Sequence, residues 1–312
     1  MSSQYHIFFT KNYANQCLEF GRFGANASNV LANVKQGDTA FLFDISCNKI
    51  FGALKIKSCS QFYENTDVFG YKKNLISRFP NRVSFEVDNI SELKLVDFFA
   101  LEAGCDAIEF HINRNILALI KGNKQVNSTT LTEIEGCYLK NKITKHGTSL
   151  NITPEMISHS PCQSVYQRMF SSRNHRSEAI FEMMLLTQKP STIFSNQEKM
   201  KVYNQFIVGF QRIIDLVIVS DLGVEIIEIK MRENHQNPFD QVSEYIKYAA
   251  YDLRFKIENF PIDRFFPIVL LEMGNMYLDE EYIPHIPGLI VYSFTFNSNY
   301  EINLNKFWPR IN

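Results

Sequence analysis

The sequence predicts two domains: an N-terminal, strand-rich domain of the α+β class and a C-terminal α/β domain with a mixed central sheet. The chain has 312 residues, about twice the roughly 150 residues of a typical domain. Short apolar segments separated by turns dominate its first part, whereas the last third alternates between helical and strand patterns. We therefore assign residues 1–120 to the first domain, 121–172 to a connector or dimerisation segment, and 173–312 to the second domain.

The composition excludes several other classes of protein. Hydrophobic residues make up 45% and charged residues 21% of the chain, which excludes a disordered, collagen-like or coiled-coil protein. Apolar runs are too short to span a membrane, and the N-terminus lacks the pattern of a signal peptide. The six cysteines contain no CxxC pair, which argues against a structural zinc site. The net charge of −1 neither favours nor excludes a nucleic-acid partner, because it averages over both domains.

In the first domain, apolar and alternating segments predict strands around short turns. Residues 5–10 predict a first strand, and residues 13–20 a short helix. The segments 40–45 and 49–57 flank the turn at 46–48, which is the pattern of a hairpin. The remaining elements expected here are a strand at 82–87, a helix at 91–103 and a strand pair at 107–120.

From residue 121 to residue 172 the composition becomes polar, with frequent Asn, Ser, Thr, Lys, Gly and Pro. One helix is expected inside this stretch, near residues 130–142. We interpret the whole stretch as the connector, and as the place where two copies of the chain would meet.

In the second domain, helical and strand patterns alternate. Residues 177–186 have helical spacing, and Pro190 ends that helix. Asn237 and Pro238 are typical of a helix start, and this helix is expected to reach about residue 257. The expected strands are 202–208, 213–219, 224–230 and 266–272.

Asp215, Glu228 and Lys230 are predicted to lie together on one hairpin. A four-residue loop at 220–223 sets a register in which Asp215 lies opposite Glu228, with Cβ atoms about 5 Å apart. Lys230 follows Glu228 by two residues, so its side chain leaves the same face of the strand. One turn therefore brings two carboxylates and one amine into a single cluster.

Such a cluster favours a divalent metal. Two close carboxylates are destabilising without a positive charge between them, and Mg²⁺ (or Mn²⁺) takes one or two protein carboxylates plus water. We expect Asp215 and Glu228 as ligands, with the backbone carbonyl of Ile229 as another and Glu178 completing the shell through a metal-bound water. Lys230 could orient or deprotonate the attacking water, or neutralise charge on a phosphorane.

The alternative is an ordinary hairpin whose polar positions face solvent. Both strands, however, are apolar on both faces around these residues. Charges embedded in such strands are costly unless they are paired or functional. We therefore favour a functional site.

These residues resemble a known family. Ile214-Asp215 followed by Glu228-Ile229-Lys230 is similar to the PD-(D/E)xK nuclease signature, with Ile in place of its Pro. Gln241 and Tyr245 match the QxxxY motif of the RecB-like branch, and Glu178 resembles the first acidic residue of that branch. The motifs occur in family order over residues 177–272.

The resemblance implies a restriction-endonuclease-like fold and assigns roles to the matching residues. Asp215, Glu228 and Glu178 would be metal ligands, and Lys230 the catalytic lysine. Gln241 and Tyr245, on the following helix, would support the site or contact a phosphate.

Residues 4–87 resemble the PUA-like superfamily, in particular its YTH, DCD and EVE branches. The resemblance is carried by the segments 7–13, 20–24, 37–43, 50–55 and 78–83. It implies a barrel that holds a modified base flipped out of nucleic acid, in a cage of aromatic rings.

The single Trp, Trp308, lies at the far end of the chain, so any cage must use Phe or Tyr. By position, Phe23 and Phe79 resemble the cage walls. The segment that meets the base edge and the backbone would be Lys11-Asn12-Tyr13. Alternatively both Phe side chains belong to the core. A phosphate-facing rim could be formed by Lys11, Arg22, Lys72, Lys73, Arg78 and Arg82, the alternative being ordinary scattered surface cations.

Together the two resemblances imply a modification-dependent restriction enzyme of a prokaryote. We expect a metal-dependent endonuclease that hydrolyses phosphodiester bonds of double-stranded DNA after recognising a modified, methylated base. Because cutting both strands needs two active sites, we expect a homodimer, with no membrane partner and in the cytoplasm. Two alternatives stay open: a NucS-like repair nuclease that reads mismatched or branched DNA, and a modified-RNA binding protein with a degenerate nuclease fold.

Overall fold

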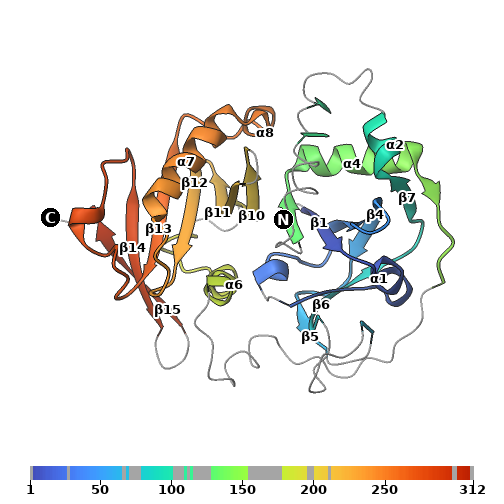
Figure 1. Ribbon diagram of the computed structural model, residues 1–312, viewed down its shortest axis with the longest axis horizontal. Coiled ribbons are helices and arrows are strands. Elements are labelled where there is room, and N and C mark those ends of the chain that lie inside the picture. Colours follow the sequence, from blue (N-terminus) through green and yellow to red (C-terminus); the bar gives the residue numbers. More distant parts are fainter. Residues whose placement is uncertain are drawn as a thin grey trace. The chain divides into compact units, whose positions relative to one another are not determined.

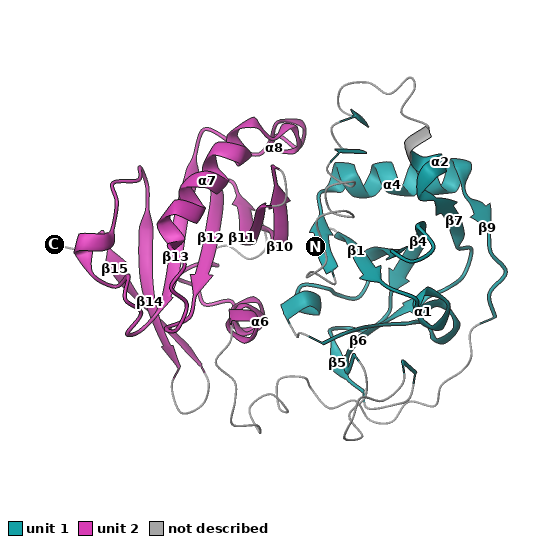
Figure 2. Ribbon diagram, viewed as in Figure 1, with its two compact units in different colours: residues 1–173 teal, residues 174–312 magenta. Residues whose placement is uncertain are grey.

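The chain divides into two compact units, residues 1–173 and 174–312 (Figure 2). The boundary lies one residue from the start predicted for the second domain. The computed structural model describes residues 3–26, 29–64, 68–69, 79–100, 109–110, 113–114, 128–153, 178–194, 200–209, 212–296 and 301–309.

Unit 1 is built on a curled, half-barrel sheet (Figure 1). Its main strands follow the order β2-β6-β4-β3-β1-β8, and β3 and β4 form the predicted hairpin. Among the described residues no pairing joins β2 to β8, so the sheet is open where a closed barrel was expected. The strands are β1 Tyr5–Thr10, β2 Arg22–Ala25, β3 Thr39–Asp44, β4 Lys49–Ile56, β5 Phe62–Tyr63, β6 Asn81–Glu86, β7 Ser91–Lys94, β8 Ser128–Leu131 and β9 Thr148–Ser149.

The predicted connector at 121–172 is corrected for its described part, 128–153, which belongs to the fold of unit 1. Strand β8 pairs antiparallel with β1. Helix α4 (Glu133–His146) begins with a capping box between Thr132 and Glu135 and packs on β4 and β7. At Gly136 of this helix an added Cβ would lie 2.0 Å from the Tyr5 ring of β1. Helix and sheet therefore approach too closely for a separate module.

Two further predictions for unit 1 are corrected. Residues 91–94 form β7 instead of a helix start, because Leu93 is buried between exposed or half-buried neighbours, the alternation of a strand. Of the described residues in the range 91–103, only those of α2 (Leu95–Ala100) are helical. Residues 109–110 and 113–114 are helical, where a strand pair was expected, and the rest of 107–120 lies outside the described residues. The other helical elements are α1 Ala14–Phe20 and η1 Asn29–Leu31.

Unit 2 has a mixed six-stranded sheet in the order β10-β11-β12-β13-β14-β15. Strands β10, β11 and β12 are antiparallel neighbours, β12, β13 and β14 run parallel, and β15 is antiparallel to β14. The strands are β10 Lys201–Val208, β11 Arg212–Ser220, β12 Gly223–Lys230, β13 Phe265–Glu272, β14 Ile290–Phe296 and β15 Ile302–Trp308, and the helical elements are α6 Glu178–Gln188, α7 Pro238–Tyr251, α8 Leu253–Ile257 and η2 Glu280–Tyr282.

Helices cover both faces of this sheet. Apolar residues of α7 pack on β12, β13 and β14 on one face. On the other face Phe181 of α6 stacks on Phe294 of β14, with ring centroids 3.7 Å apart. The helix predicted to reach residue 257 breaks at Asp252, whose carboxylate accepts the N–H of Arg254 and so starts α8.

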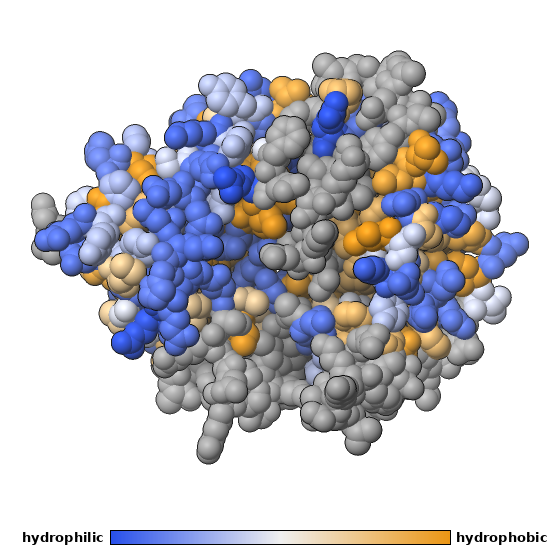
Figure 3. All heavy atoms as spheres, in the orientation of Figure 1, coloured by the Kyte–Doolittle hydropathy of each residue, from blue (hydrophilic) through white to orange (hydrophobic). Residues whose placement is uncertain are grey.

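No helix in the described part of the chain is long and apolar enough to cross a membrane. On the face seen in Figure 3, unit 2 is covered mainly by hydrophilic residues, as expected for helices with one buried and one solvated side.

Candidate active site

Asp215 lies where the β11–β12 ladder ends. The observed register, with Val219 opposite Val224, is the predicted one, although the turn is tighter because Ser220 pairs with Gly223. The last ladder pair is Leu216 with Ile227. Just beyond it, Oδ2 of Asp215 accepts the backbone N–H of Ile229 at 2.8 Å. The Asp215 carboxylate thus accepts a backbone N–H of β12 that lies beyond the last pair of the β11–β12 ladder. The metal-ligand role expected of Ile229 concerns its carbonyl group and stays a prediction.

Glu228 and Lys230 form a buried ion pair on the α7 face of the sheet. Their paired neighbours on β13, Val269 and Leu271, belong to the core beneath α7. The Lys230 Nζ donates to Oε1 of Glu228 at 2.5 Å, and the two residues are 4% and 2% exposed. Because β12 and β13 run parallel, the pair lies at their carboxyl ends, the edge where α/β sheets place ligand sites.

The electrostatics of the cluster show an excess of negative charge. Burial raises the pKa of Asp215 to about 6, against the lowering effects of Lys230 and of the Ile229 N–H. Burial and the charge of Asp215 raise the pKa of Glu228 well above its usual value. Burial alone would lower the pKa of Lys230, but the surrounding carboxylates outweigh it and the pKa is raised. Lys230 is therefore an ammonium at neutral pH.

Glu178, the first residue of α6, lies at the same cluster. Its charge contributes to the pKa shifts of Asp215, Glu228 and Lys230. Its Oε1 accepts a hydrogen bond from Nδ2 of Asn234 at 2.6 Å. The structure thus brings together all four charged residues predicted from the sequence.

Gln241 and Tyr245 reach the cluster from α7. Nε2 of Gln241 lies 3.5 Å from the Tyr245 hydroxyl. Burial, followed by the charges of Glu228 and Asp215, raises the pKa of Tyr245, which remains a neutral phenol. Tyr245 therefore lies beside the carboxylates.

The fit of this cluster to a metal rests on two carboxylates. No three carboxylate, imidazole or thiol groups form a ready-made metal site among the described residues. Mg²⁺, however, commonly binds through one or two carboxylates and retains its waters. Within the same residues, Oε2 of Glu228 and Oε1 of Gln241 are buried acceptors without a hydrogen-bond partner. A hydrated cation would supply positive charge to the first and a water proton to the second, so the donor set fits Mg²⁺ or Mn²⁺.

A further carboxylate on β12, Glu225, faces away from this cluster. It is half-buried, its Oε2 has no hydrogen-bond partner among the described residues, and burial raises its pKa to about 7. Because the pKa of Glu225 is higher in the folded state, folding favours its protonated form. The protein therefore loses stability as Glu225 ionises, while the pH rises from about 4.5 through about 7.

We therefore expect Glu225→Gln to stabilise the protein at pH 8 by about 1–3 kcal/mol, and the gain to vanish near pH 4.5. Urea unfolding at the two pH values measures this. The exposed Glu281→Gln is the matched control, with an effect within about 0.5 kcal/mol at either pH. A gain for Glu225→Gln that does not change with pH would contradict the explanation.

In unit 1, the residues predicted to bind a base do not form an open cage. Phe23 is 2% exposed and stacks on Phe8, with ring centroids 4.4 Å apart, so its side chain is part of the core. Tyr13, Phe69 and Phe79 are packed edge to face on one another, at centroid distances of 5.4–6.1 Å. Lys11 is exposed.

The predicted phosphate-facing rim is corrected at Arg22 and Arg82, whereas Lys72, Lys73 and Arg78 lie outside the described residues. Arg82 is 0% exposed, and its Nη1 donates to Oε2 of Glu64 at 2.5 Å. Arg22 is buried as well, with Nε 3.8 Å from the same carboxylate. Both arginines therefore face Glu64 inside unit 1 and are not placed on the surface to contact a phosphate.

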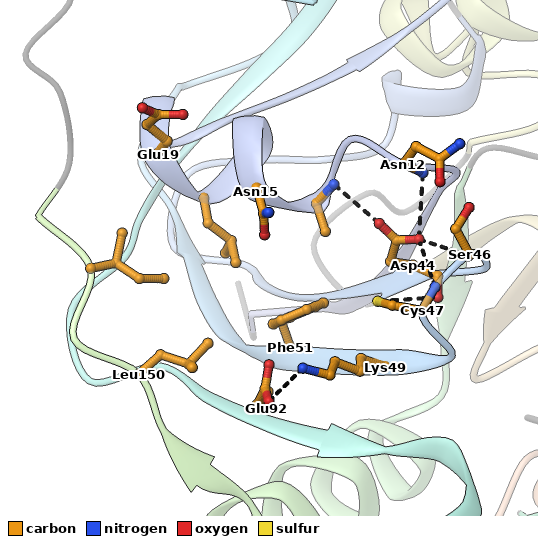
Figure 4. A pocket seen from close by; sticks show the side chains of 13 residues that line it. Asn12, Asn15, Glu19, Asp44, Ser46, Cys47, Lys49, Phe51, Glu92 and Leu150 are labelled. Carbon is orange, nitrogen blue, oxygen red and sulfur yellow. Dashed lines mark hydrogen bonds and ion pairs between the residues drawn. The ribbon is translucent and has the colours of Figure 1, made fainter.

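A cavity of about 740 Å³ lies beside Asn12 in unit 1 (Figure 4). The carboxylate of Asp44 organises one end, because it accepts the N–H groups of Ala14 at 3.2 Å and Ser46 at 2.8 Å. At the other end Lys49 and Glu92 form an ion pair at 2.7 Å. Apolar side chains complete the lining: Leu18, Phe51, Leu150 and Ile152.

Two polar residues of unit 2 with buried or site contacts were not identified from the sequence. Asn234 holds Glu178, and Glu182 accepts a hydrogen bond from Nε2 of Gln205 at 3.0 Å while only 3% exposed. Glu182 had a detectable signal, since it follows Glu178 by one helical turn in an otherwise apolar helix. Asn234 had none, because a polar residue in a loop is ordinary.

No protein-family model matches the chain, and neither does any curated protein. Among solved structures it is similar to SfsA of Pyrococcus furiosus, solved in complex with Ca²⁺. The TM-score is 0.24 and the identity 10%, over 49% of this chain and 74% of that chain. A likeness at this level carries no argument about function, so the function has to be argued from the residues of this chain.

Proposed function

We propose that unit 2 is a metal-dependent nuclease that hydrolyses phosphodiester bonds of DNA. The observation that carries the proposal is the cluster of Asp215, Glu228 and Lys230 at the carboxyl ends of two parallel strands, where burial and crowding leave the carboxylates short of positive charge. A structural ion pair would need one carboxylate for one amine. This cluster has a second at Asp215 and a third nearby at Glu178.

In this proposal Asp215 and Glu228 hold Mg²⁺ (or Mn²⁺), which polarises the phosphate and activates water. Lys230 is protonated at neutral pH, so it acts as a cation that stabilises negative charge on the phosphorane and not as a base. Tyr245, also in its neutral form, can donate a hydrogen bond to a phosphate oxygen. Gln241 positions that hydroxyl.

The proposed substrate is double-stranded DNA that carries a methylated base, with unit 1 as its reader. The cavity beside Asn12 supports this, because its volume of about 740 Å³ is within the range of small-molecule sites and its wall combines apolar with polar groups. The reading site thereby moves from the predicted Phe23–Phe79 cage to the cavity. A homodimer, which would supply one active site for each strand, is part of the proposal.

The test is cleavage of one plasmid prepared from methylating and from non-methylating hosts, with Mg²⁺ or with EDTA. We expect the wild-type protein to cut the methylated plasmid in Mg²⁺ alone. Asp215→Asn should be inactive, and Lys256→Ala, which removes an exposed lysine of α8, should cut normally. Equal cutting of both plasmids would favour the repair-nuclease alternative. Cutting of neither, with binding to modified RNA, would overturn the proposal in favour of an RNA binder.

Asn15→Trp tests the reader separately. Asn15 is exposed on α1 and lines the cavity, so an indole there fills the cavity without entering the core. We expect at least a tenfold loss of cleavage of the methylated plasmid, with metal binding and thermal unfolding unchanged. Unaltered cleavage would show that the cavity is not the reading site.

A further inference from the structure

Asn234 joins α6 to the loop that follows β12. Its Nδ2 donates to Oε1 of Glu178 at 2.6 Å, while its Oδ1 accepts the backbone N–H of Gln236 at 3.0 Å. Its own N–H donates to the carbonyl of Met231 at 3.1 Å. One side chain thus closes a turn and contacts a helix that lies more than fifty residues earlier in the chain.

The loop that carries Asn234 is held firmly from β13 and the segment after it. Oε2 of Glu272 accepts the Arg232 N–H at 2.9 Å. The buried Asn275 donates from Nδ2 to the Met231 carbonyl at 2.7 Å. The Tyr277 hydroxyl donates to the carbonyl of His235 at 2.9 Å. Asn234 is therefore carried by a loop that three hydrogen bonds tie to β13 and the segment after it.

The contact also favours an amide over a charged side chain at position 234. A carboxylate or a lysine at position 234 would repel Glu178 or neutralise it. An amide donor instead holds one oxygen of Glu178 and leaves its negative charge in place, and that charge acts on Asp215 and Glu228.

We propose that Asn234 is a positioning residue, which holds Glu178 toward Asp215 and Glu228 so that its carboxylate acts on the metal site through a metal-bound water. This inference rests on the proposed function, because it assumes that the cluster binds a divalent metal. It adds a residue outside the sequence motifs.

The test is Mn²⁺ binding by the full-length protein, measured by isothermal titration calorimetry. Asn234→Asp keeps an acceptor for the Gln236 N–H but presents a negative oxygen to Glu178. We expect its Mn²⁺ affinity to fall about 10- to 100-fold, the range for partners of metal ligands. Gln236→Glu makes the same amide-to-acid change at an exposed neighbour and should stay within about twofold of wild type. Asn234→Ser, whose shorter side chain loses the amide donor to Glu178, should behave as Asn234→Asp if the latter fails to fold.

A double-mutant cycle with Glu178→Gln gives the decisive comparison. If Asn234 acts through Glu178, Asn234→Asp should add less than about a twofold loss in the Glu178→Gln background. Wild-type affinity in Asn234→Asp, or an equal loss in both backgrounds, would overturn the inference. Failure of the folded wild-type protein to bind Mn²⁺, or equal binding by Asp215→Asn, would instead overturn the proposed function.

Discussion

Asp215→Asn is expected to abolish cleavage and, at the same time, to stabilise the metal-free protein at pH 8. The loss of activity should be at least about 100-fold, because residues that merely support a metal ligand already cost 10- to 100-fold. The gain in stability follows from the pKa of Asp215, which burial raises to about 6. Ionisation of Asp215 therefore opposes folding, and stability is lost as the pH rises from about 4 through about 6.

The expected gain is about 1–3 kcal/mol at pH 8, shrinking to zero near pH 4. Asparagine keeps an oxygen for the Ile229 N–H, so the end of the ladder is preserved. Urea unfolding in EDTA measures the gain. Adding Mn²⁺ should stabilise the wild-type protein and leave the variant unchanged, because a ligand stabilises only the state that binds it. A variant that is less stable at pH 8, or that cuts at the wild-type rate, would contradict this account of the site.

Much of the site could be predicted because the sequence contrasts sharply there. Asp215, Glu228 and Lys230 interrupt strands that are apolar on both faces, and the short turn after β11 leaves one register in which the apolar residues stay buried. Local pattern and chemistry therefore agree on one arrangement. The tie from Asn234 to Glu178 could not be predicted, because it joins residues that only the folded chain brings together.

The errors in unit 1 have a similar cause. Position along the chain suggested Phe23 as a cage wall and Arg82 as a phosphate contact, yet both side chains are buried by partners, Phe8 and Glu64, that local patterns do not reveal. The polar stretch after residue 121 hid an edge strand because β8, with sequence Ser-Thr-Thr-Leu, is hydrophilic in composition but buried in the sheet. In unit 2, β14 and β15 lay beyond the last motif and were not predicted at all.

Lys230→Met is expected to have the largest effect on stability, of the opposite sign to Asp215→Asn. Removing one partner of a buried ion pair leaves an uncompensated charge, which costs about 3–5 kcal/mol. Here Glu228 is 2% exposed and its Oε2 already has no hydrogen-bond partner among the described residues. The loss should be largest at pH 8 and clearly smaller at pH 5, because Glu228, whose pKa is already raised, then takes up a proton.

Glu228→Gln combined with Lys230→Met separates charge from packing. Neutral side chains of similar size remove the unpaired charge, so the double variant should recover to within about 1 kcal/mol of wild type at pH 8. Urea unfolding of the single and double variants at both pH values measures this. If Lys230→Met loses the same stability at pH 5 as at pH 8, or if the double variant is no better than the single one, the lost packing of the lysine stem is the cause and the electrostatic explanation is wrong.

Metal binding then distinguishes the role of Lys230 from that of Asp215. With Lys230 removed, a divalent cation becomes the main positive charge available to Glu228, so Mn²⁺ should stabilise Lys230→Met more than it stabilises the wild-type protein. Cleavage should nevertheless fall by at least about 100-fold, because the cation that neutralises the phosphorane is gone. Asp215→Asn thus loses metal binding and activity but gains stability. Lys230→Met keeps metal binding but loses activity and stability. A site that served only to hold β11 and β12 together would not separate the two variants in this way.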